Sequence, residues 1–230
     1  MHTVETTLQE LKKLVSADQD DAPYHFGITA SKSLGAIKTP DLRKLAKQIG
    51  RNQPLAQQLW NTGIHEVKHI AIFIADPKAF SEKLMEQWLK DFDSWDIVDN
   101  CCGTLFDKTP FAYEKAIEWT KRKKEFEKRA GFTMMATLAI HDKKSEDKKF
   151  EQFFPRIIAE SHDERNFVKK AINWALRQIG KRNGRLCTKA ITAAKQIQKK
   201  GDASSRWIAG DAIRELENYQ KAGRIRSIGI

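Results

Sequence analysis

The sequence predicts an all-α chain whose helices come in pairs. Three observations predict it: apolar residues recur with helical spacing along nearly the whole chain, strand-like alternation is almost absent, and the periodic segments are joined by short connections. A chain of 230 residues buries about 70% of the surface of its unfolded state, so its core requires no disulfide. We expect a single domain over residues 1–230.

The individual helices follow from periodicity and end signals. Val4 to Val15 is the first periodic segment. In the second, Thr39 is the expected N-cap, Pro40 the first helical residue, and Gly50 the stop. Further helices are expected over residues 55–60, 66–74, 81–89, 95–106, 111–120, 126–140, 150–160, 167–180, 187–199 and 205–222.

The second helix of several pairs begins with a similar pattern, a basic residue beside small and apolar ones. Lys68, Arg129 and Lys170 occupy this position, 61 and then 41 residues apart. A period near 40 residues with two helices per unit is typical of HEAT repeats. The sequence therefore predicts a curved superhelical solenoid of HEAT-like helical-pair repeats, whose second helices line a concave face.

Charge is distributed unevenly along the chain. The net charge is +11, yet residues 161–230 contain 16 basic and 6 acidic residues and so account for +10 of it. A basic region of this kind favours a polyanionic partner, with nucleic acid ahead of membrane, although a merely solubilising surface explains the charge equally well. No apolar run is long enough to span a bilayer, and the three cysteines form no disulfide or metal pattern. We expect a soluble protein of a reducing, cytoplasmic compartment.

The segment 167–181 combines basic and aromatic residues on one helical face. Lys170, Trp174, Arg177 and Lys181 fall within about 60° of one another on a helix. Such a stripe suits DNA, because the cations contact phosphates while the indole offers a flat face to a base or sugar. The alternative is that Trp174 belongs to the edge of the core and the basic residues are only solvated.

A second candidate site begins at Trp95. On a helix, Trp95 and Asp99 lie one turn apart at the edge of an apolar face that includes Cys101 and Cys102. A carboxylate beside an indole can stabilise a developing cation or orient water in glycosidic cleavage. The alternative is an acid favoured by the helix dipole, which suits Asp96 better than Asp99.

His65 to His69 match HExxH, the pattern of zinc proteases. The residues that follow supply no further histidine, and Glu82 and Glu86 have no distinguishing ligand context. We therefore expect no metal ligands and no stoichiometric zinc. The sequence also lacks a phosphate-binding glycine loop, and Cys101 and Cys102 are expected to be buried and inert.

With these residues assembled, the chain resembles the AlkD-like DNA alkylation repair family of HEAT-like-repeat DNA glycosylases. The resemblance covers nearly the whole chain and is most specific in SWDIVDNCCG and FVKKAINWALRQIGKRN. The weaker matches are residues 33–47, 59–71, 127–132 and 204–216.

This resemblance implies metal-free, cofactor-free hydrolysis of the N-glycosidic bond of alkylated N3 and N7 purines in double-stranded DNA. It places the catalytic aspartate at Asp99, the active-site tryptophans at Trp95 and Trp174, and a backbone-binding arginine at Arg129. An alkylated purine is already cationic and leaves readily, so an anion and indole faces suffice for catalysis. We expect a monomer that works in base excision repair, with DNA contacts from Lys38, Arg43, Lys170, Arg177, Lys181 and Arg182.

The chain departs from the family pattern near its N-terminus. Lys38 stands where the family has glutamine, and Tyr24 and Phe26 are only nearby candidates for the family tyrosine. The segment from Asp99 to Arg129 is also short for the family. Two alternatives remain open: a noncatalytic HEAT-repeat module that binds DNA, and a solenoid that binds an acidic protein.

Overall fold

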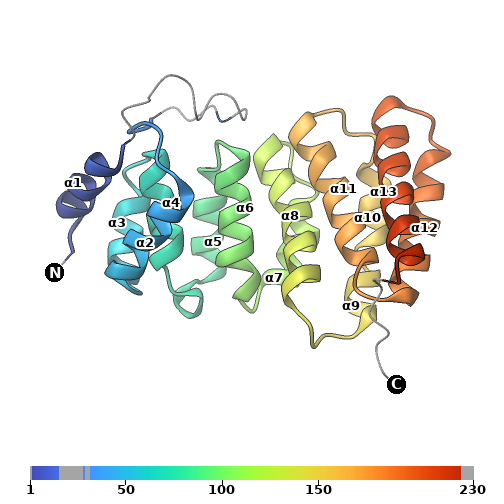
Figure 1. The fold of residues 1–230 in the computed structure, drawn as a ribbon, viewed down its shortest axis with the longest axis horizontal. Helices are drawn as coiled ribbons and strands as arrows, with labels where there is room; N and C mark the ends of the chain where they lie inside the picture. Colours follow the sequence, from blue (N-terminus) through green and yellow to red (C-terminus); the bar gives the residue numbers. More distant parts are fainter. Residues whose placement is uncertain (1, 16–27, 29–31, 224–230) are drawn as a thin grey trace. The chain divides into compact units, whose positions relative to one another are not determined.

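The computed structural model describes residues 2–15, 28 and 32–223, and within them it contains helices and no strand (Figure 1). The all-α prediction is thereby confirmed. The chain divides into two compact units, residues 1–109 and 110–230. The single domain over residues 1–230 stays a prediction. None of the helices in the described ranges is both long enough and apolar enough to cross a bilayer.

The first unit is built from six α-helices and two short 3₁₀ helices within its described residues. Helix α4 packs against α2, α3 and α6, and α1 packs on α3 and α4. The bounds are α1 Val4–Leu14, α2 Thr39–Ile49, α3 Gln53–Trp60, α4 His65–Ile74, η2 Pro77–Ala79, α5 Glu82–Lys90, α6 Trp95–Thr104 and η3 Phe106–Lys108.

Two stacked tryptophans form the centre of the first unit's aromatic core. The rings of Trp60 on α3 and Trp88 on α5 lie 4.0 Å apart and nearly parallel, and Phe80 meets Trp88 edge-on. Each indole N–H has a partner, since Trp60 donates to Asp91 and Trp88 donates to Gln57. Aromatic stacking with satisfied polar atoms therefore joins α3 to α5.

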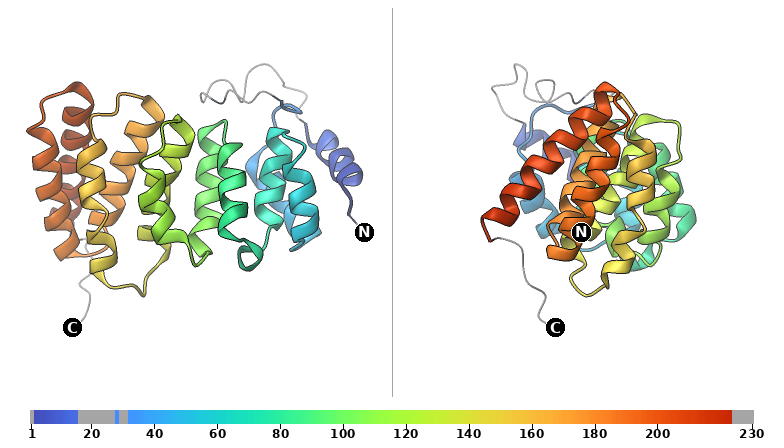
Figure 2. Two further views of the ribbon diagram at one scale, coloured as in Figure 1. Left: turned by 180° about the vertical axis from the view of Figure 1, so that it is seen from behind. Right: turned by 90° about the vertical axis from the view of Figure 1, so that its right-hand side faces the viewer.

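The second unit is a set of helices packed around α8 and α11. Helix α8 packs on α7 and α11, and α11 also contacts α10, α12 and α13; Figures 1 and 2 show α11, α12 and α13 side by side. The bounds are α7 Ala112–Trp119, α8 Glu125–His141, α9 Asp147–Glu151, α10 Phe154–Glu160, α11 Asn166–Gly180, α12 Gly184–Gln198 and α13 Ala203–Lys221.

Several helix boundaries differ from those expected, among them the following two. The helix predicted over residues 150–160 is divided into α9 and α10, because Pro155 in the first turn of α10 lacks an N–H and restrains the residue before it. Helix α2 begins at Thr39 itself, with Lys38 as the N-cap residue. It ends at Gly50 as expected, where φ is 73°.

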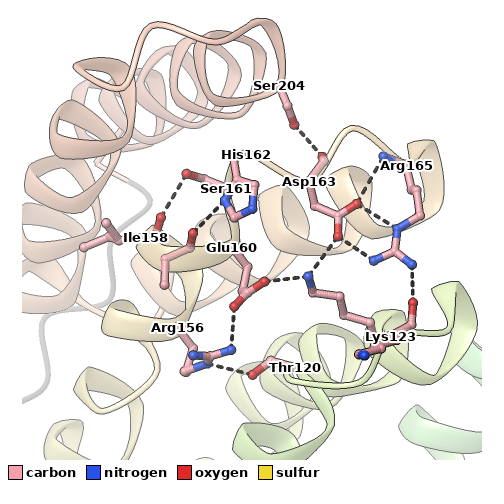
Figure 3. A network of polar contacts seen from close by, with 12 residues as sticks. Thr120, Lys123, Arg156, Ile158, Glu160, Ser161, His162, Asp163, Arg165 and Ser204 are labelled. Carbon is pink, nitrogen blue, oxygen red and sulfur yellow. Dashed lines mark hydrogen bonds and ion pairs between the residues drawn. The ribbon is translucent and has the colours of Figure 1, made fainter.

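A network of buried charges joins α8 to the turn before α11 (Figure 3). Lys128 Nζ lies 2.5 Å from Glu160 and 2.9 Å from Asp163. Arg165 also binds Asp163, at 2.6 Å, and donates to the carbonyl of Lys123. Burial opposes ionisation of Asp163, but hydrogen bonds from Arg165 and Lys128 outweigh it and hold the pKa of this carboxyl below its usual range.

The backbones of α7 and α8 in the second unit approach each other closely at Gly131 on α8. A Cβ atom there would lie 2.5 Å from the backbone nitrogen of Thr120 and 3.0 Å from the carbonyl oxygen of Ala116. These are backbone atoms at the end of α7, so a small side-chain adjustment cannot relieve the clash. Glycine is therefore what permits α7 and α8 to approach this closely.

Gly131→Ala is expected to lower the free energy of unfolding by about 2 kcal/mol, because overpacking against backbone exceeds the gain in helix propensity. The matched control is Gly210→Ala in α13, where a Cβ would meet nothing within 4 Å. That control should raise stability by up to about 1 kcal/mol. Urea unfolding of the three proteins measures both changes. Equal stability of the two variants would contradict the close approach.

Asp163→Asn is expected to lower the free energy of unfolding at pH 7 by about 1.5–3 kcal/mol. Because the folded pKa of Asp163 is lowered, its contribution is present above the unfolded pKa of about 3.9 and is lost as pH falls through the folded value. The difference from the wild type should therefore shrink below about pH 4. Urea unfolding across pH 2.5–7 measures it, with exposed Glu164→Gln as the neighbouring control. A difference that is independent of pH would contradict the assignment.

Candidate functional site

Helix α6 carries Trp95 and Asp99 in the first unit. Its apolar face is fully buried and includes Ile97, Val98 and Cys101, which fixes the orientation of the helix. Trp95 and Asp99 are half-buried at the edge of that face and one turn apart, as predicted. Cys101 is buried and reduced, and burial raises the pKa of its thiol, so it is inert as expected.

A basic pocket lies beside α6 in the same unit. Its volume is about 450 Å³, and its lining includes four cationic side chains. One of them, Arg43, is exposed, lies over the ring of Phe73 at 4.6 Å and reaches Asn100, the neighbour of Asp99, at 3.4 Å. The others are Lys47, Arg51 and Lys108. Cations grouped in this way suit a phosphate group of a nucleic acid.

Lys38, the other DNA contact predicted in the first unit, is exposed at the start of α2. Tyr24 and Phe26 lie outside the described residues.

The histidines of the HExxH sequence meet a carboxylate that sequence reasoning missed. Nε2 of His65 lies 2.9 Å and Nε2 of His69 lies 3.0 Å from Oδ2 of Asp96, on the first turn of α6. Burial disfavours ionisation of Asp96, yet the two histidine contacts hold its pKa below the usual range. The spacing of the two histidines was the one part of this cluster that could be read from the sequence. Asp96 could not be read in the same way, because it lies 27 residues after His69 on another helix and no local pattern connects them.

Arg129 is buried on α8 in the second unit. It is 6% exposed, and its Nη1 donates to the carbonyl of Phe167 at 2.6 Å, which joins α8 to the first turns of α11. Little of the guanidinium surface is thus open to a phosphate in this structure. Its predicted contact with the DNA backbone stays a prediction.

Helix α11 presents Trp174 half-buried, with Lys170 exposed one turn before it. The remaining cations of the predicted stripe face α13. Arg177 pairs with Glu215 and lies 3.7 Å from Asp211, and Lys181 also pairs with Glu215. The stripe is therefore partly neutralised within the unit.

Arg182 lines a second basic pocket, of about 880 Å³, at the start of α12. Its guanidinium stacks on Phe150 at 3.6 Å and donates to the carbonyls of Ala139 and Asp142. Arg182 thus closes the loop before α9. The exposed cations around this pocket include Lys143, Lys144 and Arg185, and acidic Glu146 and Asp147 share its lining.

Trp207 on α13 is an aromatic that the sequence analysis did not single out. It is 42% exposed, and Nζ of Lys169 on α11 lies 5.3 Å from its ring centroid. An exposed indole beside lysine is suited to stacking on an unpaired base. The dipeptide Arg206-Trp207 was the available signal.

The predicted catalytic residues thus fall into two groups. Trp95 and Asp99 share one helix of the first unit, and Arg129 and Trp174 lie on the packed pair α8 and α11 of the second.

Comparison with known proteins accounts for the fold and gives the family. One solved structure matches with a TM-score of 0.76 and 22% identity, covering 97% of this chain and 96% of the other; it represents "a new family of proteins related to the HEAT-like repeat DNA glycosylases with affinity for branched DNA structures". The likeness establishes a HEAT-like helical fold. No curated protein matches. A family model described as DNA alkylation repair enzyme matches residues 7–216, and the chain therefore belongs to the DNA alkylation repair enzyme family.

Proposed function

We propose that this protein is a DNA glycosylase that releases cationic N3- and N7-alkylated purines from duplex DNA. The observation that carries the proposal is the pair Trp95 and Asp99 on one edge of α6, beside a basic pocket, in a member of this family. Trp174 and the exposed cation Lys170 would contact the DNA on the second unit.

The chemistry needs few groups. An alkylated purinium leaves as a neutral base when the C1′–N bond breaks, so the leaving group requires neither protonation nor a metal. Positive charge then develops on the deoxyribose, where the carboxylate of Asp99 stabilises it and an indole face adds cation–π attraction. Water adds to C1′ and its proton passes to Asp99 or to solvent, which leaves an abasic site.

Asp99→Asn is expected to reduce release of 3-methyladenine and 7-methylguanine from methylated DNA by about 100-fold or more, because the amide cannot stabilise the developing cation. DNA binding should be retained, since Asp99 contributes no positive charge. Single-turnover base release and a DNA titration, run side by side, separate the two effects.

The matched control is Glu114→Gln, which makes the same carboxylate-to-amide change at an exposed position of α7 and should leave release unchanged. Equal release by wild type and Asp99→Asn would remove the catalytic role of Asp99. No release by the wild type would leave the noncatalytic alternative.

That alternative is a protein that binds DNA structures without excising bases. It is favoured by the similar protein of known structure, which is described as having affinity for branched DNA. The exposed indole of Trp207 beside Lys169 fits this function, because branch points offer unstacked bases.

Lys170→Gln is expected to weaken DNA binding a few-fold at low salt and to reduce the slope of log K against log salt by about 0.9, the contribution of one phosphate contact. Titration of linear and branched duplexes at several salt concentrations measures both quantities. Lys12→Gln, an exposed lysine of α1, is the control. Identical slopes for Lys170→Gln and the wild type would exclude Lys170 from the interface.

A further inference from the structure

Two histidines of α4 and an aspartate of α6 converge on one point in the first unit. His65 and His69 are one helical turn apart, and their Nε2 atoms lie 2.9 and 3.0 Å from the same oxygen, Oδ2 of Asp96. The histidines are 6% and 4% exposed. Among the described residues, this is the only group of three such side chains close enough to share a metal ion.

Some polar atoms of this cluster have hydrogen-bond partners and others have none within the described residues. Both imidazoles point at Oδ2, while Oδ1 of Asp96 is buried and has no partner within the described residues. Nδ1 of each histidine is likewise buried without a partner there. A cluster held only by hydrogen bonds gains more by using both carboxylate oxygens, because an unpartnered buried acceptor costs about 1–3 kcal/mol. Two imidazole nitrogens and a carboxylate oxygen within 4.8 Å of one another are also a donor set that suits a zinc-class ion.

The lysine of α4 is engaged elsewhere. Nζ of Lys68 donates to the backbone carbonyl of Asp91 and to the carboxylate of Asp93. Lys68 therefore does not compete with the two imidazoles for the carboxylate of Asp96.

Glu66 is turned away from the histidines. Its two carboxylate oxygens accept from the hydroxyl of Ser33 at 2.6 Å and from the backbone N–H of Leu34 at 2.8 Å. It thus anchors the segment before α2, and the general base of a zinc protease has no counterpart here.

We propose that His65, His69 and Asp96 bind one divalent transition-metal ion of the zinc class. Two imidazoles bound through Nε2 at about 2.0–2.1 Å in a tetrahedral site have ring centroids roughly 5 Å apart, and the separation here is 5.0 Å. The three candidate ligand atoms all lie within 4.8 Å of one another. The buried Oδ1 of Asp96 or a water would complete the site.

The ion would cross-link α4 to α6 next to Trp95. Asp96 is the residue after Trp95 and three before Asp99, so a bound metal restrains the turn that carries both. The proposal does not depend on glycosylase activity, and it replaces the expectation of no metal site, which rested on the lack of a third ligand near the histidines in sequence.

The test is cobalt and zinc binding by the full chain, prepared without a histidine tag and stripped of metal. Cobalt should bind with one ion per chain and give the visible absorption of a tetrahedral site, and zinc should displace it. Magnesium should not compete, because imidazole ligands select against it. Zinc in excess should raise the thermal midpoint by roughly 5 °C or more.

His69→Gln and Asp96→Asn keep hydrogen-bonding groups but remove metal ligands. Each should weaken metal binding by more than about 100-fold, which exceeds the loss expected when only an outer-shell partner of a ligand is removed. His162→Gln, at an exposed position before α11, should bind as the wild type does. Absence of one-to-one binding by the wild type overturns the proposal without any variant, and so does unchanged affinity in a folded His69→Gln. Base release is not measured, so failure of the glycosylase proposal leaves this result intact.

Discussion

In each unit, the packing of neighbouring helices depends on an ion pair made by a buried lysine near the start of a helix. Lys68 is the fourth residue of α4 and Lys128 the fourth residue of α8, and both are less than 10% exposed. Each reaches a carboxylate in the turn before a later helix, Asp93 before α6 and Asp163 before α11. A buried ammonium is tolerated only when it is paired, so these contacts fix which turn must lie beside which helix.

Pairing of charged side chains also explains why α4 and α8 can be buried on nearly every side while carrying charges. In α4, Glu66 binds Ser33 and Leu34, and the histidines meet Asp96. In α8, the guanidinium of Arg129 bonds to the first turns of α11. The charged first turns therefore act as polar connections to neighbouring helices, while the apolar remainder forms the core. On α11 the fourth residue is Lys169, which lies over Trp207 of α13 in place of a carboxylate.

The parts of this structure that could be predicted are those set by local physics. Helical periodicity predicted the helices. The repeated pattern was placed at Lys68, Arg129 and Lys170, whereas the fourth residues of α4, α8 and α11 are Lys68, Lys128 and Lys169. The break at Pro155 was also readable, since proline restrains the residue before it, but the expected helix over 150–160 passed through it. Asp96 and Glu215 could not be found as partners, because they lie 27 and 38 residues from His69 and Arg177 and only packing brings them together. A helical wheel places Arg177 on a face; it does not say which helix that face meets.

The basic residues of the last third of the chain are therefore less available to DNA than their net charge of +10 suggests. Arg177 and Lys181 share Glu215, and a phosphate would have to replace that carboxylate, exchanging one ion pair for another with little net gain. Arg182 already satisfies backbone carbonyls, so moving it to DNA would leave buried acceptors unpaired. An exposed lysine such as Lys170 loses only solvation and gains counterion release. Exposed cations beside α2 and α11, rather than the densest basic sequence, should consequently set the salt dependence of DNA binding.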